Sequence, residues 1–136
     1  MALGCVIVDD SAAFVAAARS LLERQGISVL GAAANSADAV RLVAQLRPDV
    51  VLVDIDLGPE SGLQLTRRLA SPADPAPPPV ILISTYAEED YADLLVDNPA
   101  VGFIPKTTLS AAAIRELLDG PRTDVPPRRI TGPPER

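Results

Sequence analysis

Histidine is absent from the sequence, and cysteine occurs once, at Cys5. The missing histidine excludes Ser-His-Asp and Cys-His catalytic arrangements and removes the commonest zinc ligand. One cysteine cannot form a disulfide within the chain. Because Cys5 lies in an apolar run, we interpret it as a buried small hydrophobe and not as a reactive thiol. Histidine-based catalysis and most zinc sites are therefore excluded.

Aromatic residues and long apolar runs are also scarce. Aromatics make up 3% of the 136 residues, so the core must be built from aliphatic side chains. No apolar stretch approaches the roughly 20 residues that a membrane span requires. The N-terminus runs into Asp9 and Asp10 without the basic start of a signal peptide. We therefore expect a cytoplasmic protein with no membrane partner.

Basic residues are outnumbered, and only one of them is a lysine, Lys106. The net charge of −6 makes the chain a poor binder of nucleic acid. Lysine is a compact point charge on a flexible stem, whereas arginine is a planar fork. A single lysine among arginines indicates a site that arginine cannot serve, although a genome-wide bias toward arginine would give the same composition.

Short apolar runs alternate with longer amphipathic segments along the chain. Five runs are β-branched and apolar on both faces, which is typical of strands in a parallel sheet covered on both sides. These predicted strands are 3–8, 29–34, 50–53, 80–83 and 101–104. The caps and apolar spacing of the intervening segments predict helices. These predicted helices are about 12–25, 36–47, 61–70, 88–96 and 109–119.

Repeated strand–helix units predict an α/β fold with one open parallel sheet. Right-handed crossovers place helices on both faces, and five strands fit the flavodoxin-like order 2-1-3-4-5. We expect this domain to span residues 1–119. Residues 120–136 contain five prolines and almost no apolar side chains, so we expect a disordered tail or linker there.

Chemically active side chains follow four of the predicted strands. Asp9 and Asp10 follow the first, Asp54 the third, Ser84 the fourth and Lys106 the fifth. The carboxyl ends of parallel strands meet at one edge, where such sheets bind ligands. Clustered carboxylates take up protons or bind a cation such as Mg²⁺. A lysine and a hydroxyl beside them would contact phosphoryl oxygens, so the pattern predicts phosphoryl transfer to an aspartate.

Four motifs in order carry a resemblance to a known family. They are Val6-Ile-Val-Asp-Asp10, Val51-Leu-Val-Asp54, Ile81-Leu-Ile-Ser84 and Gly102-Phe-Ile-Pro-Lys106. The chain resembles the receiver domain of response regulators in two-component signalling, especially receivers that precede a helix-turn-helix output domain. The resemblance implies a phosphorylation-dependent switch and not an enzyme that acts on a separate substrate. DNA would be contacted only through an output domain outside this chain.

The resemblance also implies a partner, a cofactor and an acceptor. Asp54 matches the phosphoacceptor, which takes the phosphoryl group from a sensor histidine kinase or a phosphotransfer protein. Asp9 and Asp10 match the acidic pair that holds Mg²⁺ together with Asp54, and the backbone carbonyl of Asp56 matches a further ligand of the metal. These roles are expectations for this chain.

Three more residues match the part of the family that responds to phosphorylation. Ser84 and Lys106 match the groups that act with Asp54 and contact the attached phosphoryl group. Phe103 matches an aromatic switch position that moves inward when Ser84 is drawn to the phosphate. The face formed by the fourth helix, fifth strand and fifth helix would then change its packing, and it is a candidate for a homodimer contact.

Two alternatives remain open at this stage. Thr85 follows Ser84 where the family usually has a smaller residue, and its bulk could narrow access to Asp54. The chain would then be a docking domain that works without phosphorylation. Asp54-Ile-Asp56 also resembles the D-x-D motif of aspartyl-phosphate phosphatases, but that motif belongs near a first strand in a longer chain with a cap.

Overall fold

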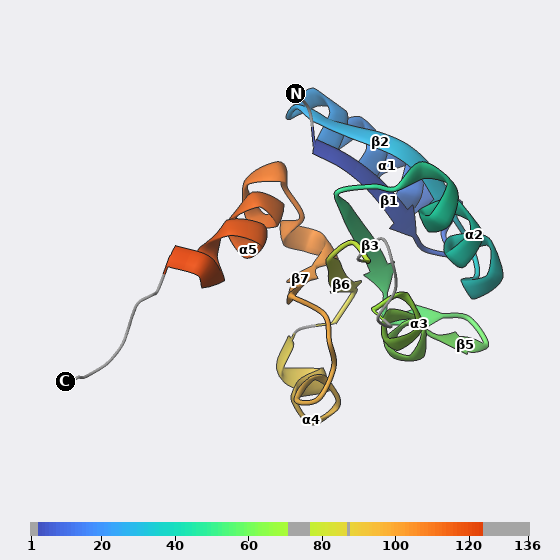
Figure 1. The fold of residues 1–136 in the computed structure, drawn as a ribbon, viewed down its shortest axis with the longest axis vertical. Coiled ribbons are helices and arrows are strands. Elements are labelled where there is room, and N and C mark those ends of the chain that lie inside the picture. The colour runs from blue at the N-terminus through green and yellow to red at the C-terminus, as the bar shows by residue number, and fades with distance from the viewer. Residues whose placement is uncertain (1–2, 71–76, 87, 124–136) are drawn as a thin grey trace.

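The computed structural model describes residues 3–70, 77–86 and 88–123. Its main sheet contains five parallel strands in the order β2-β1-β3-β6-β7 (Figure 1). The strands are β1 (Leu3–Val8), β2 (Ile27–Ala33), β3 (Val50–Asp54), β6 (Val80–Ser84) and β7 (Gly102–Pro105). This arrangement confirms the predicted α/β fold and the order 2-1-3-4-5.

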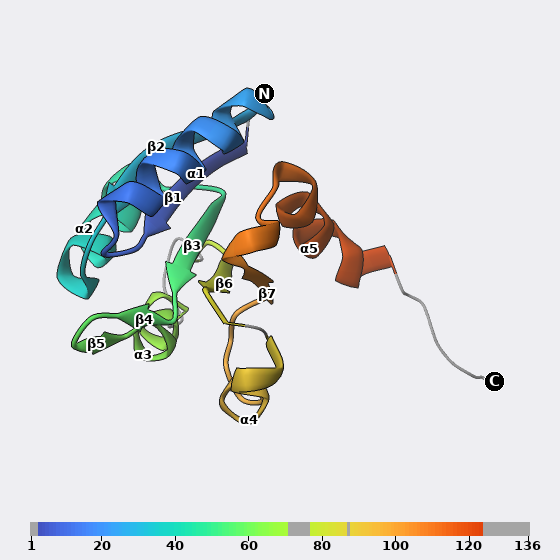
Figure 2. The same cartoon turned by 180° about the vertical axis from the view of Figure 1, so that it is seen from behind.

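Side chains of β1 alternate between two separate cores, one on each face of the sheet. Cys5 and Ile7 pack with residues of α1 (Ala12–Arg24) and α5 (Ala111–Thr123). Val6 and Val8 pack with residues of α2 (Ser36–Leu46), α3 (Gly62–Leu69) and α4 (Ala92–Leu95). Figure 1 and Figure 2 view these helices from opposite sides. Burial on both faces explains why the central strands read as continuous apolar runs.

Polar side chains cap the starts of three of the helices. Ser11 accepts a hydrogen bond from Phe14 N at the start of α1, and Asn35 accepts one from Asp38 N at the start of α2. Ser61 does the same for the first turn of α3. Each cap satisfies a backbone donor that has no partner within the helix, and this fixes where the helix begins.

The predicted helix at 88–96 is wrong in form. The chain makes a 3-10 turn, η1 (Glu88–Tyr91), followed by the short helix α4. A 3-10 turn advances three residues per turn and eclipses side chains at that spacing. This local geometry directs Tyr91 toward the sheet, where its ring lies 6.0 Å from the ring of Phe103 between centroids.

The end of the last predicted helix is also wrong. A short 3-10 turn, η2 (Lys106–Thr108), precedes α5, and α5 continues past Asp119 through Gly120 and Pro121 to Thr123. Glycine costs about 1 kcal/mol relative to alanine in a helix without forbidding helical backbone. The predicted tail at 120–136 therefore begins within α5, and residues 124–136 lie outside the described residues.

A small antiparallel hairpin was not predicted. Its strands β4 (Asp56–Leu57) and β5 (Glu60–Ser61) follow β3 directly (Figure 2). Gly58 turns the chain with a φ of +64°, a conformation that suits glycine. Glu60 Oε1 accepts a hydrogen bond of 2.8 Å from Ser36 N, which ties the hairpin to the start of α2.

Within the described parts of the chain, no helix has both the length and the apolar character needed to cross a membrane.

Candidate functional site

Three acidic side chains converge at the carboxyl edge of the sheet. Asp9 and Asp10 follow β1, and Asp54 is the last residue of β3, the strand next to β1. Each of the three offers a carboxylate oxygen, and these oxygens all lie within 4.8 Å of one another. Asp9 and Asp54 are buried, whereas Asp10 is exposed. The strand order brings these residues together, as the sequence pattern predicts.

Lys106 enters the same cluster from the end of β7. Its Nζ atom lies 2.7 Å from Asp9 Oδ2 and 3.2 Å from Asp54 Oδ2. The amine also lies 4.4 Å from the centroid of the Phe14 ring, over the ring face. The Lys106 side chain is only 15% exposed, so two carboxylates and an aromatic ring hold one cation in a largely buried position.

Burial and charge compete in setting the pKa values of this cluster. Burial raises the pKa of Asp54 from 3.8 to about 6, and the charge of Asp9 acts in the same direction. A hydrogen bond from Asp56 N and the charge of Lys106 oppose this increase. Burial lowers the pKa of Lys106, but the carboxylates of Asp9 and Asp54 outweigh it, so the net pKa lies above the usual value. Lys106 is therefore a cation at neutral pH.

The donor set fits a hard divalent cation. Asp9 Oδ1 accepts a hydrogen bond of 2.8 Å from Ser11 N. Asp9 Oδ2 is buried and accepts no hydrogen bond of good geometry, although it lies within ion-pair distance of Lys106. A buried carboxylate oxygen with unused acceptor capacity, beside two more carboxylates, suits Mg²⁺, which prefers oxygen ligands. The side chain of Asp56 does not belong to this group of three.

Ser84 ends β6 with a hydroxyl that is already hydrogen-bonded. The residue is 1% exposed, and its Oγ accepts a hydrogen bond of 3.1 Å from Tyr86 N. The Tyr91 hydroxyl lies 2.9 Å from the same Oγ. The side chain of Tyr91 also reaches Asp56 Oδ2, at 3.4 Å. Thr85, whose bulk raised the question of access to Asp54, is exposed to solvent.

Two aromatic contacts of the site were missed by sequence analysis. Phe14 lies on the first predicted helix, and its contact with Lys106 was not predicted. Tyr91 was placed on a regular helix and received no role, yet it contacts Ser84, Asp56 and Phe103. The sequence offers one signal for these contacts, which is that aromatic residues are rare. The chain contains only two tyrosines and two phenylalanines.

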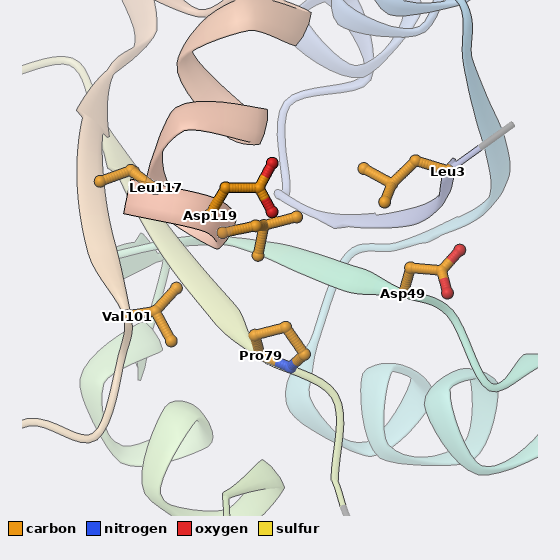
Figure 3. Close-up of a pocket in the computed structure, with 7 residues that line it drawn as sticks. Leu3, Asp49, Pro79, Val101, Leu117 and Asp119 are labelled. Carbon is orange, nitrogen blue, oxygen red and sulfur yellow. The ribbon is translucent and has the colours of Figure 1, made fainter. Parts of the chain in front are cut away.

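A pocket lies at the opposite edge of the sheet. It has a volume of about 380 Å³ and opens between the amino ends of the strands, near Leu3, Pro79 and Val101 (Figure 3). Leu117 and Asp119 of α5 complete much of its wall. The cluster of Asp9, Asp54 and Lys106 follows the carboxyl ends of the strands, so the pocket is not part of this site.

Known proteins share both the sequence pattern and the fold. Residues 5–119 match the family described as the response regulator receiver domain. Protein PilH of Pseudomonas aeruginosa is 40% identical over 84 residues, which cover 62% of this chain and 69% of that protein. A protein-glutamate methylesterase/protein-glutamine glutaminase of Alkalilimnicola ehrlichii is 35% identical, over 78% of this chain and 27% of that protein.

A solved structure with a similar fold carries a modified aspartate. It is a response regulator protein of Burkholderia pseudomallei with a phosphorylated aspartic acid, a calcium ion and citrate. The TM-score is 0.70 at 26% identity, and the match covers 85% of this chain and 66% of that one. Since the chain spans less than a third of the methylesterases that it matches, their esterase activity is not carried over. The chain belongs to the response regulator receiver domain family.

Proposed function

We propose that this chain is a phosphorylation-dependent signalling switch in which Asp54 is the phosphoacceptor. The observation that carries the proposal is the buried Asp54 carboxylate, which lies 3.2 Å from the amine of Lys106 and clusters with the carboxylates of Asp9 and Asp10. The donor would be a phosphohistidine on a sensor histidine kinase or a phosphotransfer protein. We expect the exchange to take place in the cytoplasm.

The reaction needs Asp54 in its ionised form. A carboxylate oxygen attacks the phosphorus atom while the phosphorus–nitrogen bond of the phosphohistidine breaks. The bonding electrons stay on the imidazole nitrogen, which takes up a proton, and Asp54 becomes an acyl phosphate. Because the pKa of Asp54 is about 6, the carboxyl is mostly ionised at neutral pH. Lys106 would offset the charge on the transferred group.

Mg²⁺ fits the proposed site as a cofactor. The carboxylates of Asp9, Asp10 and Asp54 would hold it, and the family resemblance adds the backbone carbonyl of Asp56. The ion supplies positive charge that stabilises the phosphoryl oxygens during transfer. The structure of the Burkholderia pseudomallei protein contains both a phosphorylated aspartic acid and a calcium ion, and this supports a divalent cation as cofactor of the proposed reaction.

The signal would leave the site through Ser84 and Phe103. Once Asp54 is phosphorylated, Ser84 and Lys106 contact the phosphoryl group, and the Phe103 side chain moves inward. Phosphorylation then shifts the populations of two packings of the same surface. A local change of charge can alter a distant contact in this way. The face of α4, β7 and α5 would bind a partner protein or a second copy of the chain. DNA would be bound only by a further domain.

The test is uptake of phosphate from a small donor. The full chain is incubated with acetyl phosphate, with Mg²⁺ or with a chelator, and the phosphorylated fraction is measured by intact mass. We expect uptake only with Mg²⁺ and none in Asp54→Asn. No uptake by the unsubstituted chain with Mg²⁺ present would overturn the proposal.

The same assay separates the two alternatives. A docking domain that works without phosphorylation would take up no phosphate and would bind its partner equally well after Asp54→Asn. Occlusion of Asp54 by the Thr85 side chain would favour the docking domain. A phosphatase would instead release phosphate repeatedly from an ester without any kinase.

A further inference from the structure

Tyr91 contacts Asp56 and both residues of the proposed switch, Ser84 and Phe103. Its hydroxyl lies 2.9 Å from Ser84 Oγ and 3.4 Å from Asp56 Oδ2, and its ring centroid lies 6.0 Å from that of Phe103. Tyr91 ends the 3-10 turn η1, which precedes α4. It is half-buried, so its side chain is placed by packing as well as by hydrogen bonds.

One arrangement of the protons satisfies all the hydrogen bonds in this group. An ionised carboxylate accepts hydrogen bonds and donates none, so the Tyr91 proton points to Asp56 Oδ2. A tyrosine hydroxyl has one proton, so toward Ser84 the Tyr91 oxygen must act as the acceptor. The Ser84 hydroxyl therefore donates to Tyr91, while Ser84 Oγ accepts from Tyr86 N.

The single donor of Ser84 is consequently in use before any phosphoryl group arrives. A phosphoryl oxygen on Asp54 is an acceptor, so Ser84 can contact it only by donating that same proton. Ser84 cannot donate to Tyr91 and to the phosphoryl group together. We propose that Tyr91 is a positioning residue that competes with the phosphorylated Asp54 for the Ser84 hydroxyl and thereby stabilises the unphosphorylated state. This inference rests on the proposed function.

Loss of the Tyr91–Ser84 hydrogen bond would connect the rotation of Ser84 to the packing of η1 against β7. Once Ser84 turns to the phosphoryl group, Tyr91 keeps only the long hydrogen bond to Asp56 and its ring contacts with Phe103 and Tyr86. The η1 turn is then held less firmly against β7. Tyr91 therefore couples the rotation of Ser84 to the position of Phe103.

The test uses the full chain with Mg²⁺ and beryllium fluoride, which mimics a phosphoryl group on a carboxylate. Binding is followed by fluorine NMR. We expect Tyr91→Phe to bind the mimic about threefold to tenfold more tightly, as the loss of one competing neutral hydrogen bond implies. Phenylalanine keeps the ring, so the contact with Phe103 is preserved. Tyr86→Phe is the matched control, because Tyr86 contacts Ser84 through its backbone N–H.

A double-mutant cycle separates competition from a merely structural role. In a Ser84→Ala background, Tyr91→Phe should no longer change the affinity, because the shared proton is gone. Equal or weaker binding by Tyr91→Phe in the native background, or an effect that persists in the Ser84→Ala background, would overturn the inference and leave the proposed function standing. Absence of Mg²⁺-dependent binding by the unsubstituted chain and by Tyr91→Phe would overturn both.

Discussion

The Cα atom of Gly62 packs against the backbone carbonyl of Asp54, and a Cβ at this position would overlap that oxygen. Gly62 begins α3, and its N–H donates a 2.8 Å hydrogen bond to Ile55 O. We expect Gly62→Ala to lower the free energy of unfolding by about 1–3 kcal/mol, a typical cost of overpacking. It should also slow phosphate uptake, since the end of β3 must shift. Urea unfolding and the acetyl phosphate assay measure these effects.

Gly31→Ala is the matched control for Gly62→Ala. A Cβ at Gly31 meets the Leu46 Cδ1 atom at 3.1 Å, which is the far end of a flexible side chain. We expect a change in stability within about 0.5 kcal/mol and unchanged uptake. Equal stability and equal uptake in Gly62→Ala and the unsubstituted chain would show that the close approach to Asp54 has no functional consequence.

Mg²⁺ should stabilise the fold, because it binds the native cluster and relieves repulsion among three carboxylates. At about ten times the dissociation constant, the free energy of unfolding should rise by about 1.4 kcal/mol, which corresponds to a Tm increase of a few degrees. Asp10→Asn should reduce this increase, and the exposed Asp97→Asn should not. A Tm that is independent of Mg²⁺ would contradict the metal site.

Lys106 should stabilise the cluster in the absence of metal. Lys106→Met leaves Asp9 and Asp54 buried without their cation, and removal of one partner from a buried ion pair costs about 3 kcal/mol. Mg²⁺ should restore part of this loss. Lys106→Arg keeps the charge but not the compact amine, so it should retain more stability than Lys106→Met while reducing phosphate uptake. Full stability of Lys106→Met without Mg²⁺ would rule out this role.

Cys5 gives the stability a defined pH dependence. Burial raises the pKa of its thiol from 9.0 to about 12, so above pH 9 the unfolded chain releases a proton that the folded chain keeps. The protonated Cys5 thiol makes its full contribution to the free energy of unfolding below pH 9, and this contribution is lost as pH rises toward 12. The free energy of unfolding should therefore fall by about 1 kcal/mol more in the unsubstituted chain than in Cys5→Ala between pH 8 and pH 10. Parallel pH profiles would contradict this assignment.

The sheet and the cluster could be predicted because both depend on simple periodic signals. Buried parallel strands read as short apolar runs, and the carboxyl ends of such strands share an edge, so Asp9, Asp54 and Lys106 had to converge once the order was known. Strand β2 begins at Ile27, two residues earlier than predicted. The prediction missed this start because the exposed Ser28 interrupts the apolar run.

The missed features depend on local geometry that periodicity does not encode. The hairpin of β4 and β5 has two residues in each strand, too few for an alternating pattern to show. Tyr91 ends the 3-10 turn η1, which has three residues per turn, and the apolar spacing of the segment gave no sign of this form. The contact between Gly62 and Asp54 joins the start of α3 to the end of β3. The hydrophobic pattern of the sequence does not indicate how closely these two elements approach.

The most direct test of the account is to locate the phosphoryl group after treatment with acetyl phosphate and Mg²⁺. Borohydride reduces an aspartyl phosphate to homoserine, which marks the modified position in a peptide map. The account predicts homoserine at position 54 alone, dependent on Mg²⁺ and absent in Asp54→Asn. Homoserine at another acidic residue, or none at all, would contradict it.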